Sequence, residues 1–566
     1  MQRAINISVL CLLLLTLVTP ATASASPAHD EAVPQFRAFW VDAFGPGMFT
    51  PAEIDQLVAD TKAANMNAIV AQVVRRGDCF CNKSILPRTE QVGVAPEPFD
   101  PLQYLLDKAH AEGIEVHAWV IATSIWNYLA PPRFPINPNH VFNLHGPYAD
   151  GTDNWTMYRY DGAYRGGSDY LLDPGHPAAA DYIVKMFTSL VENYDVDGVN
   201  FDRIRYPDQN LLNQGVAMPS WGYNPVAVAR FQDATGRTDI PFPTDPDWMQ
   251  WRRDQVTNIV RRVYLETTAI RPNIRVSAAT ITYGYGPQSV TGGYEGTRTY
   301  GEVLQDWRGW MQEGILDLNL PMNYKREHYV TEPNNQLRMF EEWNEFAKDN
   351  QYGRQVVIGS AVYLNYITGS VAQARKSLEP SAAGNPAVGW IAYSYRTPDA
   401  IANANPNSAA IASAQRAELI RALTQPSEYD PILPPVFANP VPVPDMPWKS
   451  QPTKGHLMGT VKTPDGEPFD QLRVDLYQGD DLIASRVTDG TGWFGFVDLA
   501  PGHYKVRVDQ TRAHGHHWNM MVWVSAGEVA TVEMTPFKWG EEGNRPVYPK
   551  DGFDPDEPEM FMNGER

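Results

Sequence analysis

Long hydrophobic runs are missing from almost the whole of this 566-residue sequence. The one extended apolar run lies near the N-terminus, where Val9–Val18 follows Arg3. Small residues come next and offer cleavage sites after Ala23 or Ala25, so residues 1–25 are interpreted as a secretory signal peptide. No later stretch reaches the roughly 18 apolar residues of a spanning helix. We therefore expect an exported protein, periplasmic or extracellular, with no integral membrane segment after cleavage.

Cysteine is scarce too, with three residues in the chain. Cys11 lies inside the signal peptide, so the mature protein keeps only Cys79 and Cys81, in "DCFCN". In an exported chain such a pair forms either a small local disulfide or two free cysteines. The strain of so tight a ring makes the disulfide the less favoured of these two alternatives, and both stay open. Packing rather than crosslinks must therefore supply most of the stability.

Positive charge is in short supply, since 46 Lys and Arg face 66 Asp and Glu, for a net charge of −20. An acidic surface repels phosphate backbones, which excludes nucleic acid as the expected partner. The sequence also lacks an HExxH motif, a Gly-rich phosphate loop and a paired CxxC, so we expect no cofactor and no metal. Aromatic residues are plentiful, including 16 Trp and 27 Tyr, and suit a protein that presents flat apolar faces, for which sugar rings are one ligand.

Eight short apolar or β-branched runs recur along the chain, and helical patterns follow most of them. The runs are "FRAFWVDA" near 36, "MNAIVAQVV" near 66, "IEVHAWVIA" near 114, "VDGVNFD" near 196, "IRVSAATIT" near 274, "LDLNLPMNY" near 316, "QVVIGSAVY" near 355 and "AVGWIAYSY" near 387. Amphipathic helices are predicted over 51–65, 101–112, 177–193 and 247–270. Strands alternating with helices predict an α/β fold, a (β/α)₈ TIM barrel over residues 35–424.

Two long insertions, 122–176 and 206–246, follow predicted strands on the face where barrel active sites are built. The first is rich in aromatics and either forms a substrate rim or packs into a small satellite core. It ends in "DPGHP", which contains Asp173 and His176 and is interpreted as a turn before the 177–193 helix.

The composition changes near residue 425. Residues 425–453 carry nine prolines and no periodic apolar pattern, which indicates a semi-rigid linker. Residues 454–537 alternate with period two between turn signals such as "PDGE" and "DGTG", which predicts a small antiparallel β-sandwich. Residues 538–566 are acidic and rich in Pro and Gly, which favours a disordered tail.

The fourth run ends unusually, in "DGVNFDRIRYP", with Asp202 followed by Arg203 and Arg205. In a barrel Asp202 would stand at the C-terminal end of the fourth strand, where a carboxylate can act as a nucleophile or stabilise an oxocarbenium-like transition state. Either arginine can reach Asp202 only if the chain turns after the strand. A structural Asp–Arg salt bridge that closes the barrel end is the alternative.

The stretch "DGVNFDRIRYP" resembles the fourth-strand signature of glycosyl-hydrolase-like family ten, a group of bacterial TIM-barrel proteins. The likeness continues through "FRAFWVDAFGPG", "NAIVAQVVRRGDCFCNKS", "HAEGIEVHAWVIATSIWN" and "LLDPGHPAAADYIV" and covers roughly residues 35–420. It implies hydrolysis of glycosidic bonds, with peptidoglycan glycan strands among the substrates, and it makes Asp202 the leading catalytic carboxylate.

A glycosidase needs a second carboxyl group, about 5–5.5 Å from the first for retention or about 6.5–9.5 Å for inversion. Glu327, after the sixth run, is our first choice for the general acid, and Asp42, after the first run, is the second. Asp78, after the second run, is a further candidate acid, and we predict that it binds substrate.

Other residues at the expected strand ends are predicted to bind substrate. His117 could bond a sugar hydroxyl or be a satisfied histidine of the packed barrel layer, and Trp119 could stack on a sugar. Arg75 or Arg76 could clamp a substrate carboxylate such as a lactyl group, and an Arg–Asp pair that holds the loop is the alternative. The full set of predicted binding residues is Arg75, Asp78, His117, Trp119, Trp126, Arg205, Asn323, Tyr324 and Tyr393.

In the C-terminal region, "VTDGTGWFGFVDLAPGHYKVRV" resembles the carboxypeptidase-regulatory-like sandwich, which implies a spacer or binding accessory without catalysis. His514, His516 and His517 lie on a loop or edge of this sandwich and are interpreted as exposed histidines rather than as a metal site. Two functions stay open at this stage: an exported glycoside hydrolase, and a non-catalytic carbohydrate-binding or scaffold protein of the envelope. The oligomeric state cannot be inferred.

Overall fold

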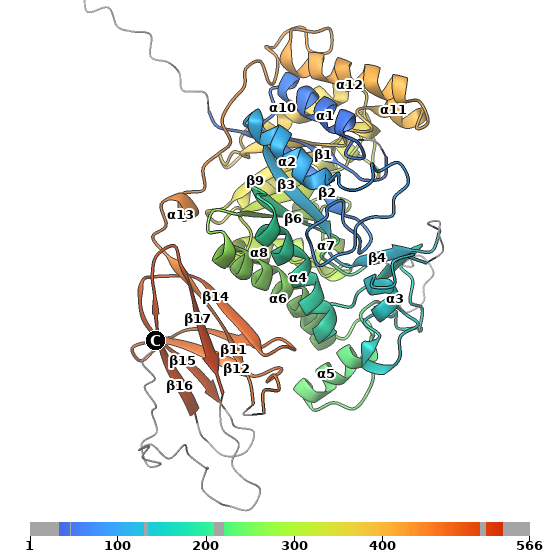
Figure 1. Ribbon diagram of the computed structural model, residues 1–566. Coiled ribbons are helices and arrows are strands. Elements are labelled where there is room, and N and C mark those ends of the chain that lie inside the picture. The colour runs from blue at the N-terminus through green and yellow to red at the C-terminus, as the bar shows by residue number, and fades with distance from the viewer. Residues whose placement is uncertain are drawn as a thin grey trace, which may run out of the picture. The chain divides into compact units, whose positions relative to one another are not determined.

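The computed structural model describes residues 33–45, 47–129, 134–208, 220–463, 465–509 and 517–535. Within these residues eight parallel strands close into a barrel (Figure 1). In chain order they are β1 (Phe36–Val41), β2 (Ala68–Val74), β3 (Glu115–Ile121), β6 (Gly198–Asp202), β7 (Arg275–Ile281), β8 (Leu318–Met322), β9 (Gln355–Ala361) and β10 (Gly389–Tyr393). Each lies on one of the eight predicted runs, so the prediction of a TIM barrel is confirmed.

Helices separate consecutive barrel strands. The larger ones are α1 (Pro51–Ala63), α2 (Pro101–Ala111), α4 (Pro177–Asn193), α5 (Pro225–Thr235), α6 (Pro246–Ile270), α8 (Trp307–Glu313), α9 (Gln336–Asp349), α10 (Ile367–Leu378) and α12 (Ala409–Thr424). The shorter ones are α3 (Val141–His145), α7 (Arg298–Gly301), α11 (Ala400–Ala404) and α13 (Pro447–Ser450), with 3₁₀ turns at 151–153, 287–289, 293–296 and 362–364. All four predicted helices are confirmed.

Capping explains where two of these helices start. The Thr50 hydroxyl accepts a hydrogen bond from Glu53 N at the start of α1, and Asp100 Oδ1 accepts one from Gln103 N at the start of α2. Both caps are followed by proline, which needs no hydrogen-bond acceptor at the first helical position. These short polar side chains therefore fix how each helix leaves the loop before it.

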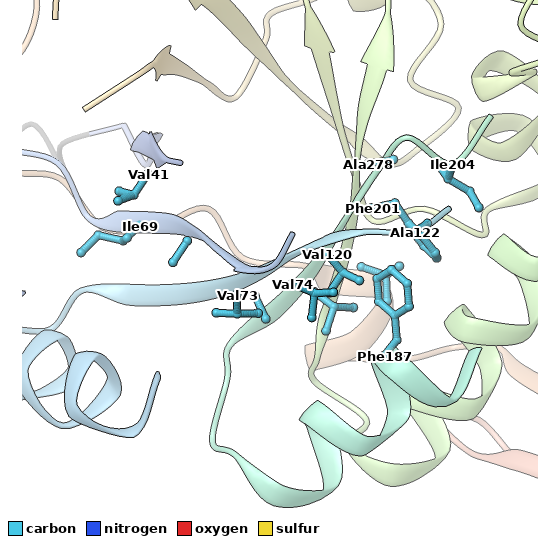
Figure 2. Packing of buried hydrophobic residues seen from close by; sticks show 14 of the residues in the cluster. Val41, Ile69, Val73, Val74, Val120, Ala122, Phe187, Phe201, Ile204 and Ala278 are labelled. Carbon is cyan, nitrogen blue, oxygen red and sulfur yellow. The ribbon is translucent and has the colours of Figure 1, made fainter. Parts of the chain in front are cut away.

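Alternation along the strands divides the core into two layers. Phe36, Ala38 and Trp40 of β1 lie in the cluster that fills the barrel, whereas Phe39 and Val41 belong to the larger cluster between strands and helices. Figure 2 shows the outer layer where β3 and β6 meet α4: Phe187 of the helix packs on Phe201 of β6 with ring centroids 4.3 Å apart. Both layers are apolar, as a parallel barrel requires.

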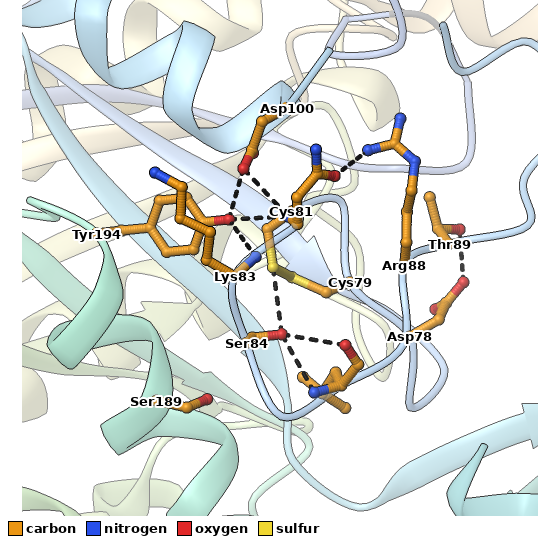
Figure 3. The surroundings of a disulfide bond; sticks show 12 residues. Asp78, Cys79, Cys81, Lys83, Ser84, Arg88, Thr89, Asp100, Ser189 and Tyr194 are labelled. Carbon is orange, nitrogen blue, oxygen red and sulfur yellow. Dashed lines mark hydrogen bonds between the residues drawn. A yellow bond between two sulfur atoms is a disulfide. The ribbon is translucent and has the colours of Figure 1, made fainter. Parts of the chain in front are cut away.

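The structure joins Cys79 and Cys81 in a disulfide, the less favoured of the two alternatives that the sequence left open (Figure 3). Phe80 is buried and stacks on Phe49, and the chain bends at Phe80 and Cys81, which brings the two cysteines together. Their Cα atoms are 5.0 Å apart, within the usual range for a bridge. The loop beyond is held by the Tyr194 hydroxyl, which accepts hydrogen bonds from Asn82 N and Lys83 N at 2.8 Å each.

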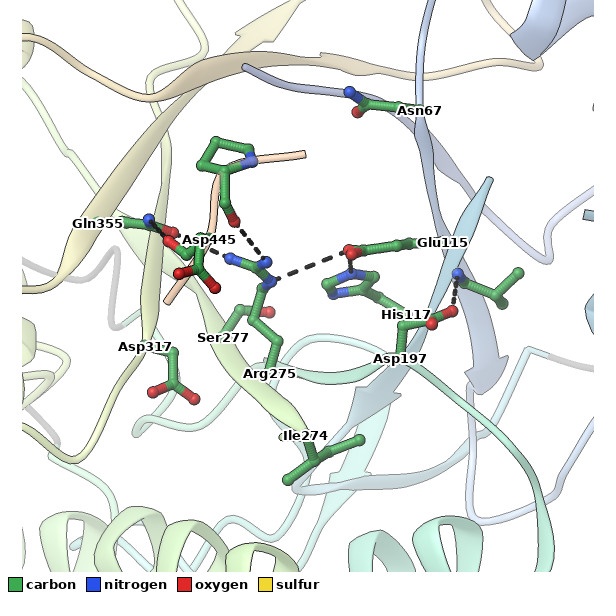
Figure 4. Close-up of polar contacts among 12 residues, drawn as sticks. Asn67, Glu115, His117, Asp197, Ile274, Arg275, Ser277, Asp317, Gln355 and Asp445 are labelled. Carbon is green, nitrogen blue, oxygen red and sulfur yellow. Dashed lines mark hydrogen bonds and ion pairs between the residues drawn. The ribbon is translucent and has the colours of Figure 1, made fainter. Parts of the chain in front are cut away.

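Polar residues occupy the N-terminal end of the barrel (Figure 4). Arg275 of β7 donates to Gln355 Oε1 at 2.9 Å and to the carbonyl of Pro444 at 3.0 Å, and it lies 3.9 Å from Glu115. The linker, although rich in proline, therefore contacts the barrel through its carbonyl groups. Asn67 Nδ2 likewise donates to the carbonyl of Val441 at 2.9 Å, so this segment lies along the barrel floor.

Two further sheets follow the linker. Within the described residues the strands β14 (Trp493–Leu499), β11 (Gly455–Val461) and β17 (Val529–Met534) form one sheet, and β13 (Asp481–Val487), β12 (Arg473–Gln478), β15 (Gly502–Asp509) and β16 (His517–Val524) form the other. The prediction of an all-β accessory region is confirmed. The prediction of a wholly antiparallel one is wrong, because β11 and β17 pair in parallel.

Several predicted features fall outside the described residues, namely the signal peptide, His514, His516 and the C-terminal tail. His517 begins β16, a strand that was not predicted. In the part of the chain that is described, no helix combines the length and the apolar character needed to cross a bilayer.

Candidate active site

Asp202 ends the fourth barrel strand, as predicted. Asn200, two residues earlier, points into the barrel and donates to Ser277 Oγ of β7 at 2.8 Å, so the same alternation directs Asp202 inward at the C-terminal end. Its Oδ2 accepts a hydrogen bond from the Trp119 indole at 3.1 Å, and its Oδ1 accepts one from Arg203 N at 2.6 Å. Asp202 is 8% exposed, and no cation among the described residues forms a salt bridge with it.

The turn after β6 directs the neighbouring guanidinium to Asp169 rather than into a salt bridge with Asp202. Arg203 adopts φ of 51°, a left-handed conformation, and its side chain pairs with Asp169 of the short strand β5 (Asp169–Leu171). The alternative prediction, that an Asp202–Arg salt bridge closes the barrel end, is therefore wrong. Arg203 closes the end through Asp169 instead and leaves Asp202 with neutral donors.

Aromatic side chains surround the end of the barrel next to Asp202. Tyr324 and Tyr393 stack with ring centroids 5.2 Å apart, and Trp40 stands edge-on to both at 6.0 and 6.1 Å. Trp119 lies edge-on to Tyr393 at 6.3 Å. Both tyrosines, predicted from the sequence, are half-buried, so part of each ring is open to a ligand.

Two carboxylates act on this tyrosine pair. Burial raises the pKa of the Tyr393 phenol, and the charges of Asp42 and Asp202 raise it further. The same two carboxylates contribute to the raised pKa of Tyr324. Asp42 and Asp202 therefore both lie near the phenols of this aromatic pair, which brings two of the three predicted catalytic acids to the same end of the barrel.

Asp42 is more tightly engaged than Asp202. Its Oδ2 accepts a hydrogen bond from Ser394 Oγ at 2.8 Å, and its Oδ1 accepts one from Arg396 Nε at 3.0 Å. Arg396 also lines a pocket of about 330 Å³, together with residues of α1, α11 and α12. The remaining nitrogens of its guanidinium form no hydrogen bond within the described part of the chain, so they are free to bind a ligand group.

Two predicted site residues point away from Asp202. Glu327 lies against Gly369 of α10 and lines a pocket between α9 and α10. Asn323 donates to the carbonyl of Phe340 and to Asn344, both on α9, because it faces the helices rather than the barrel. Neither side chain forms a hydrogen bond with Asp202 or with the tyrosine pair of Tyr324 and Tyr393.

His117 is fully buried in the barrel and contacts Glu115 at 3.0 Å. Its ring lies edge-on to Phe36, so it belongs to the packed layer near the floor, and the prediction that it binds a sugar hydroxyl is wrong. A strand position identifies the face of a side chain but not its depth in the barrel.

Two further predicted residues hold loops. Arg75 is buried and donates to the carbonyl of Ala43 and to Gln91. Asp78 accepts hydrogen bonds from Arg76 N at 3.3 Å and from the Thr89 hydroxyl. These contacts stabilise the loop after β2 and leave neither residue directed at a substrate.

Trp126, on the short strand β4 (Ser124–Asn127), is buried and packs edge-on against His140. The aromatics of its insertion mostly pack on one another, for example Phe142 on Tyr170 at 4.8 Å. The satellite-core alternative is therefore confirmed for these residues. Asp173 of "DPGHP" accepts a hydrogen bond from Gly175 N at 2.9 Å, as expected of a turn.

The guanidinium groups of two arginines form no hydrogen bond within the described chain. Arg205, which was predicted, has a buried Nε with no acceptor and lies near the Tyr283 phenol. Arg76, the alternative to Arg75 as a carboxylate clamp, faces the exposed ring of Phe44, with 5.9 Å between the guanidinium carbon and the ring centroid. The charges of Asp169 and Asp78 act on Arg76, which places it beside the Arg203–Asp169 pair.

The barrel is similar to known proteins. The family model for glycosyl hydrolase-like 10 matches residues 35–363. The chain is 25% identical over 337 residues to glycosyl hydrolase DigH of Escherichia coli K12, a match that covers 55% of this chain and 70% of that protein. It is 26% identical over 279 residues to glycosyl hydrolase YngK of Bacillus subtilis 168, covering 48% of each.

Among solved structures, the glycoside hydrolase domain of PgaB (BpsB) from Bordetella bronchiseptica aligns with 16% identity and a TM-score of 0.44, over 68% of this chain and 98% of that domain. The residues matched by the family model end before the sandwich, so the likeness of that region to carboxypeptidase-regulatory-like domains stays a prediction.

Proposed function

Because the chain belongs to the glycosyl hydrolase-like 10 family and is a glycoside hydrolase, we propose that it is exported and cleaves the glycan strands of peptidoglycan, with Asp202 as its central catalytic carboxylate. One observation carries this assignment. Asp202 stands at the C-terminal end of the fourth strand, held by two neutral donors and free of any salt bridge with the described cations. A carboxylate so placed can attack an anomeric carbon or stabilise the positive charge that develops there.

The aromatic residues supply the binding surface for the sugar at the reacting position. A sugar ring is apolar on its C–H face, so it can lie against the open parts of Tyr324 and Tyr393, which border the two acids. The hydroxyl groups at the rim of the ring then remain available to polar neighbours. This arrangement positions a glycosidic bond next to Asp202.

Arg76 and Arg205 favour an acidic glycan over a neutral one. Neither guanidinium has a hydrogen-bond partner in the described chain, and a partly desolvated cation gains most from an anionic ligand. Peptidoglycan glycan strands from which the peptides have been removed carry a free lactyl carboxylate on alternate sugars, which matches this chemistry. Export rests on the signal-peptide pattern of residues 1–25.

Asp42 is the best-placed second carboxyl group. It shares the tyrosine pair with Asp202, whereas Glu327 lies against α10. We therefore assign Asp202 to the anomeric carbon and Asp42 to the leaving-group side, where Asp42 can donate a proton only once a bound substrate weakens its ion pair with Arg396, which favours the carboxylate form. This reverses the order of preference that the sequence suggested.

The decisive experiment measures the release of reducing ends from purified peptidoglycan glycan strands. The Asp202→Asn variant should lose nearly all activity and keep its melting temperature. Asp195→Asn is the matched control, because Asp195 lies seven residues earlier on the surface, with 83% of its side chain exposed. Full activity of Asp202→Asn would refute the assignment, and wild-type activity on chitin but none on peptidoglycan strands would refute the substrate.

A further inference from the structure

The four-stranded sheet of the C-terminal sandwich has an outer face that belongs to none of the hydrophobic clusters formed by the described residues. Tyr504 and Val506 of β15 point into the sandwich core, so His503 and Lys505 point outward. The pairing of β15 with β16 and β12 brings further side chains onto the same face (Figure 1). We define the outer face by Trp523 and Met521 of β16, His503 and Lys505 of β15, Tyr477 of β12 and Leu482 of β13.

Trp523 is the most unusual member of this outer face. It is 54% exposed, although tryptophan is among the side chains that gain most from burial, and Leu482 at the other edge is 49% exposed. The imidazole of His503 supports the indole from the side, with ring centroids 4.8 Å apart at 70°. An apolar band that crosses a sheet and is edged by polar groups marks a binding surface.

Lys505 lies in the middle of the band. Its ammonium group stands 5.3 Å from the centre of the Tyr477 ring, and no carboxylate among the described residues forms a salt bridge with it. The chain has a net charge of −20, so a lysine without a carboxylate partner, placed between Tyr477 and Trp523, is unusual on its surface. It offers an attractive site for an anion at the point where the aromatic rings would hold a ligand.

The spacing suits an extended ligand. Trp523 and Tyr477 are two strands and one same-face row apart, which corresponds to about 12 Å between their Cα atoms from ordinary sheet geometry. This distance exceeds one sugar ring and is spanned by a short run of them. A protein partner would also use tryptophan, but the linear order of ring, cation and ring across a flat sheet fits a strand of sugars with acidic substituents better.

We propose that the outer face of the sandwich binds an acidic glycan strand, with sugar rings stacked on Trp523 and an anionic substituent next to Lys505. This surface would keep the enzyme on a polymer while the barrel acts elsewhere on it. It lies outside the catalytic barrel, so binding does not require the proposed hydrolysis to be correct.

The test measures sedimentation of the full-length protein with an insoluble polymer. The protein carries Asp202→Asn, so that binding is measured without degradation of the polymer. Purified peptidoglycan sacculi are the acidic probe, and chitin is the uncharged one. The variants are Trp523→Ala, Trp523→Phe and Lys505→Ala. Tyr352→Ala is the control, because Tyr352 is an aromatic residue of the barrel region that is 48% exposed.

We expect Trp523→Ala to weaken binding to sacculi by about tenfold or more, as the loss of a central aromatic contact does. Trp523→Phe should restore part of the binding, Lys505→Ala should weaken binding to sacculi and remove its salt dependence, and Tyr352→Ala should bind like its parent. With an active Asp202, Trp523→Ala should turn over soluble glycan fragments normally.

Three outcomes would overturn the proposal: absence of binding to either polymer, undiminished binding of Trp523→Ala, or an equal loss in Tyr352→Ala. Equal binding to chitin and sacculi, with no effect of Lys505→Ala, would overturn the acidic ligand. Loss of hydrolysis with intact binding would instead concern only the proposed function, so the two failures are distinguishable.

Discussion

Replacement of Trp119 by phenylalanine tests how Asp202 is held. In the native protein the indole Nε1–H donates to Asp202 Oδ2 at 3.1 Å, and Trp119 is 5% exposed. Phenylalanine keeps an aromatic ring next to Tyr393 but removes the donor. One oxygen of the carboxylate then has no protein partner, and its side chain is free to rotate away from the reacting carbon.

The size of the effect follows from the hydrogen bond. A hydrogen bond to a charged group contributes about 1.5–3 kcal/mol, against about 1 kcal/mol for a neutral one. Since about 1.36 kcal/mol corresponds to a tenfold change in rate, kcat should fall by roughly ten- to one-hundred-fold. Trp119 acts through Asp202 and is too buried to offer a sugar much surface, so KM should change little.

The assay measures initial rates of reducing-end release over a range of glycan-strand concentrations, together with the melting temperature. An unchanged kcat in a stably folded Trp119→Phe variant would refute the positioning role. A loss confined to KM would show that Trp119 contacts the substrate directly, as the sequence suggested. Either result would remove the structural reason for the orientation of Asp202.

Four further predictions concern separate parts of the barrel. Lys449→Met should lower the free energy of unfolding by about 3–5 kcal/mol, because it leaves the buried Asp317 carboxylate without the ammonium group 2.6 Å away. His176 is buried, which lowers its pKa to about 4, so the folded state resists a proton that the unfolded chain accepts below about pH 6.5. Between pH 6.5 and 4 the native protein should therefore lose about 3 kcal/mol more stability than His176→Gln does, as measured by urea unfolding. Glu327→Gln should keep the native kcat, since its side chain lies against α10. Asp42→Asn should lose activity on glycan strands but keep part of it on aryl glycosides, whose leaving groups need no proton.

Each of these predictions has an outcome that contradicts it. Lys454→Met, at an exposed lysine five residues along, is the control for Lys449, and equal stability of the two variants would show that the buried pair contributes nothing. Parallel pH curves for His176→Gln and the native protein would exclude His176 as the acid-sensitive group. Loss of activity in Glu327→Gln would support the sequence-based assignment of Glu327 as the general acid. Equal losses of Asp42→Asn on both substrates would exclude its role at the leaving group.

The strands of the barrel could be predicted because the interior and the helix layer both require apolar residues. Each barrel strand is therefore apolar at consecutive positions, as in "MNAIVAQVV", and such a run is recognisable in the sequence. The floor of the barrel could not be predicted in the same way. Asp317 and Arg275 are charged, yet they lie at the starts of β8 and β7, where Lys449 and the carbonyl of Pro444 from the linker satisfy them. Only the folded chain brings together partners so far apart in the sequence.

The proline-rich pattern of the linker is compatible both with a free spacer and with a segment that packs on the barrel. Nine prolines and no periodicity are typical of a spacer, but proline also leaves carbonyl oxygens free of local hydrogen bonds. Here the carbonyls of Asn439 and Val441 accept hydrogen bonds from Arg37 and Asn67 at 2.7 and 2.9 Å. Composition indicates that such a segment forms no helix, and it does not indicate whether the segment packs.

Asp42 and Asp202, the two acids near the aromatic pair, each occupy the next inward-facing position of their strand. Asp42 continues the inward series Phe36, Ala38 and Trp40 of β1, and Asp202 continues the inward series of β6. In β8 the inward series runs through Leu320 and Met322 to Tyr324, and a turn follows before Glu327, so alternation no longer fixes where Glu327 points. A carboxylate two residues beyond the last inward position is therefore a stronger catalytic candidate than one beyond a turn. On that ground the strand pattern alone ranks Asp42 above Glu327, whatever the length of the side chain.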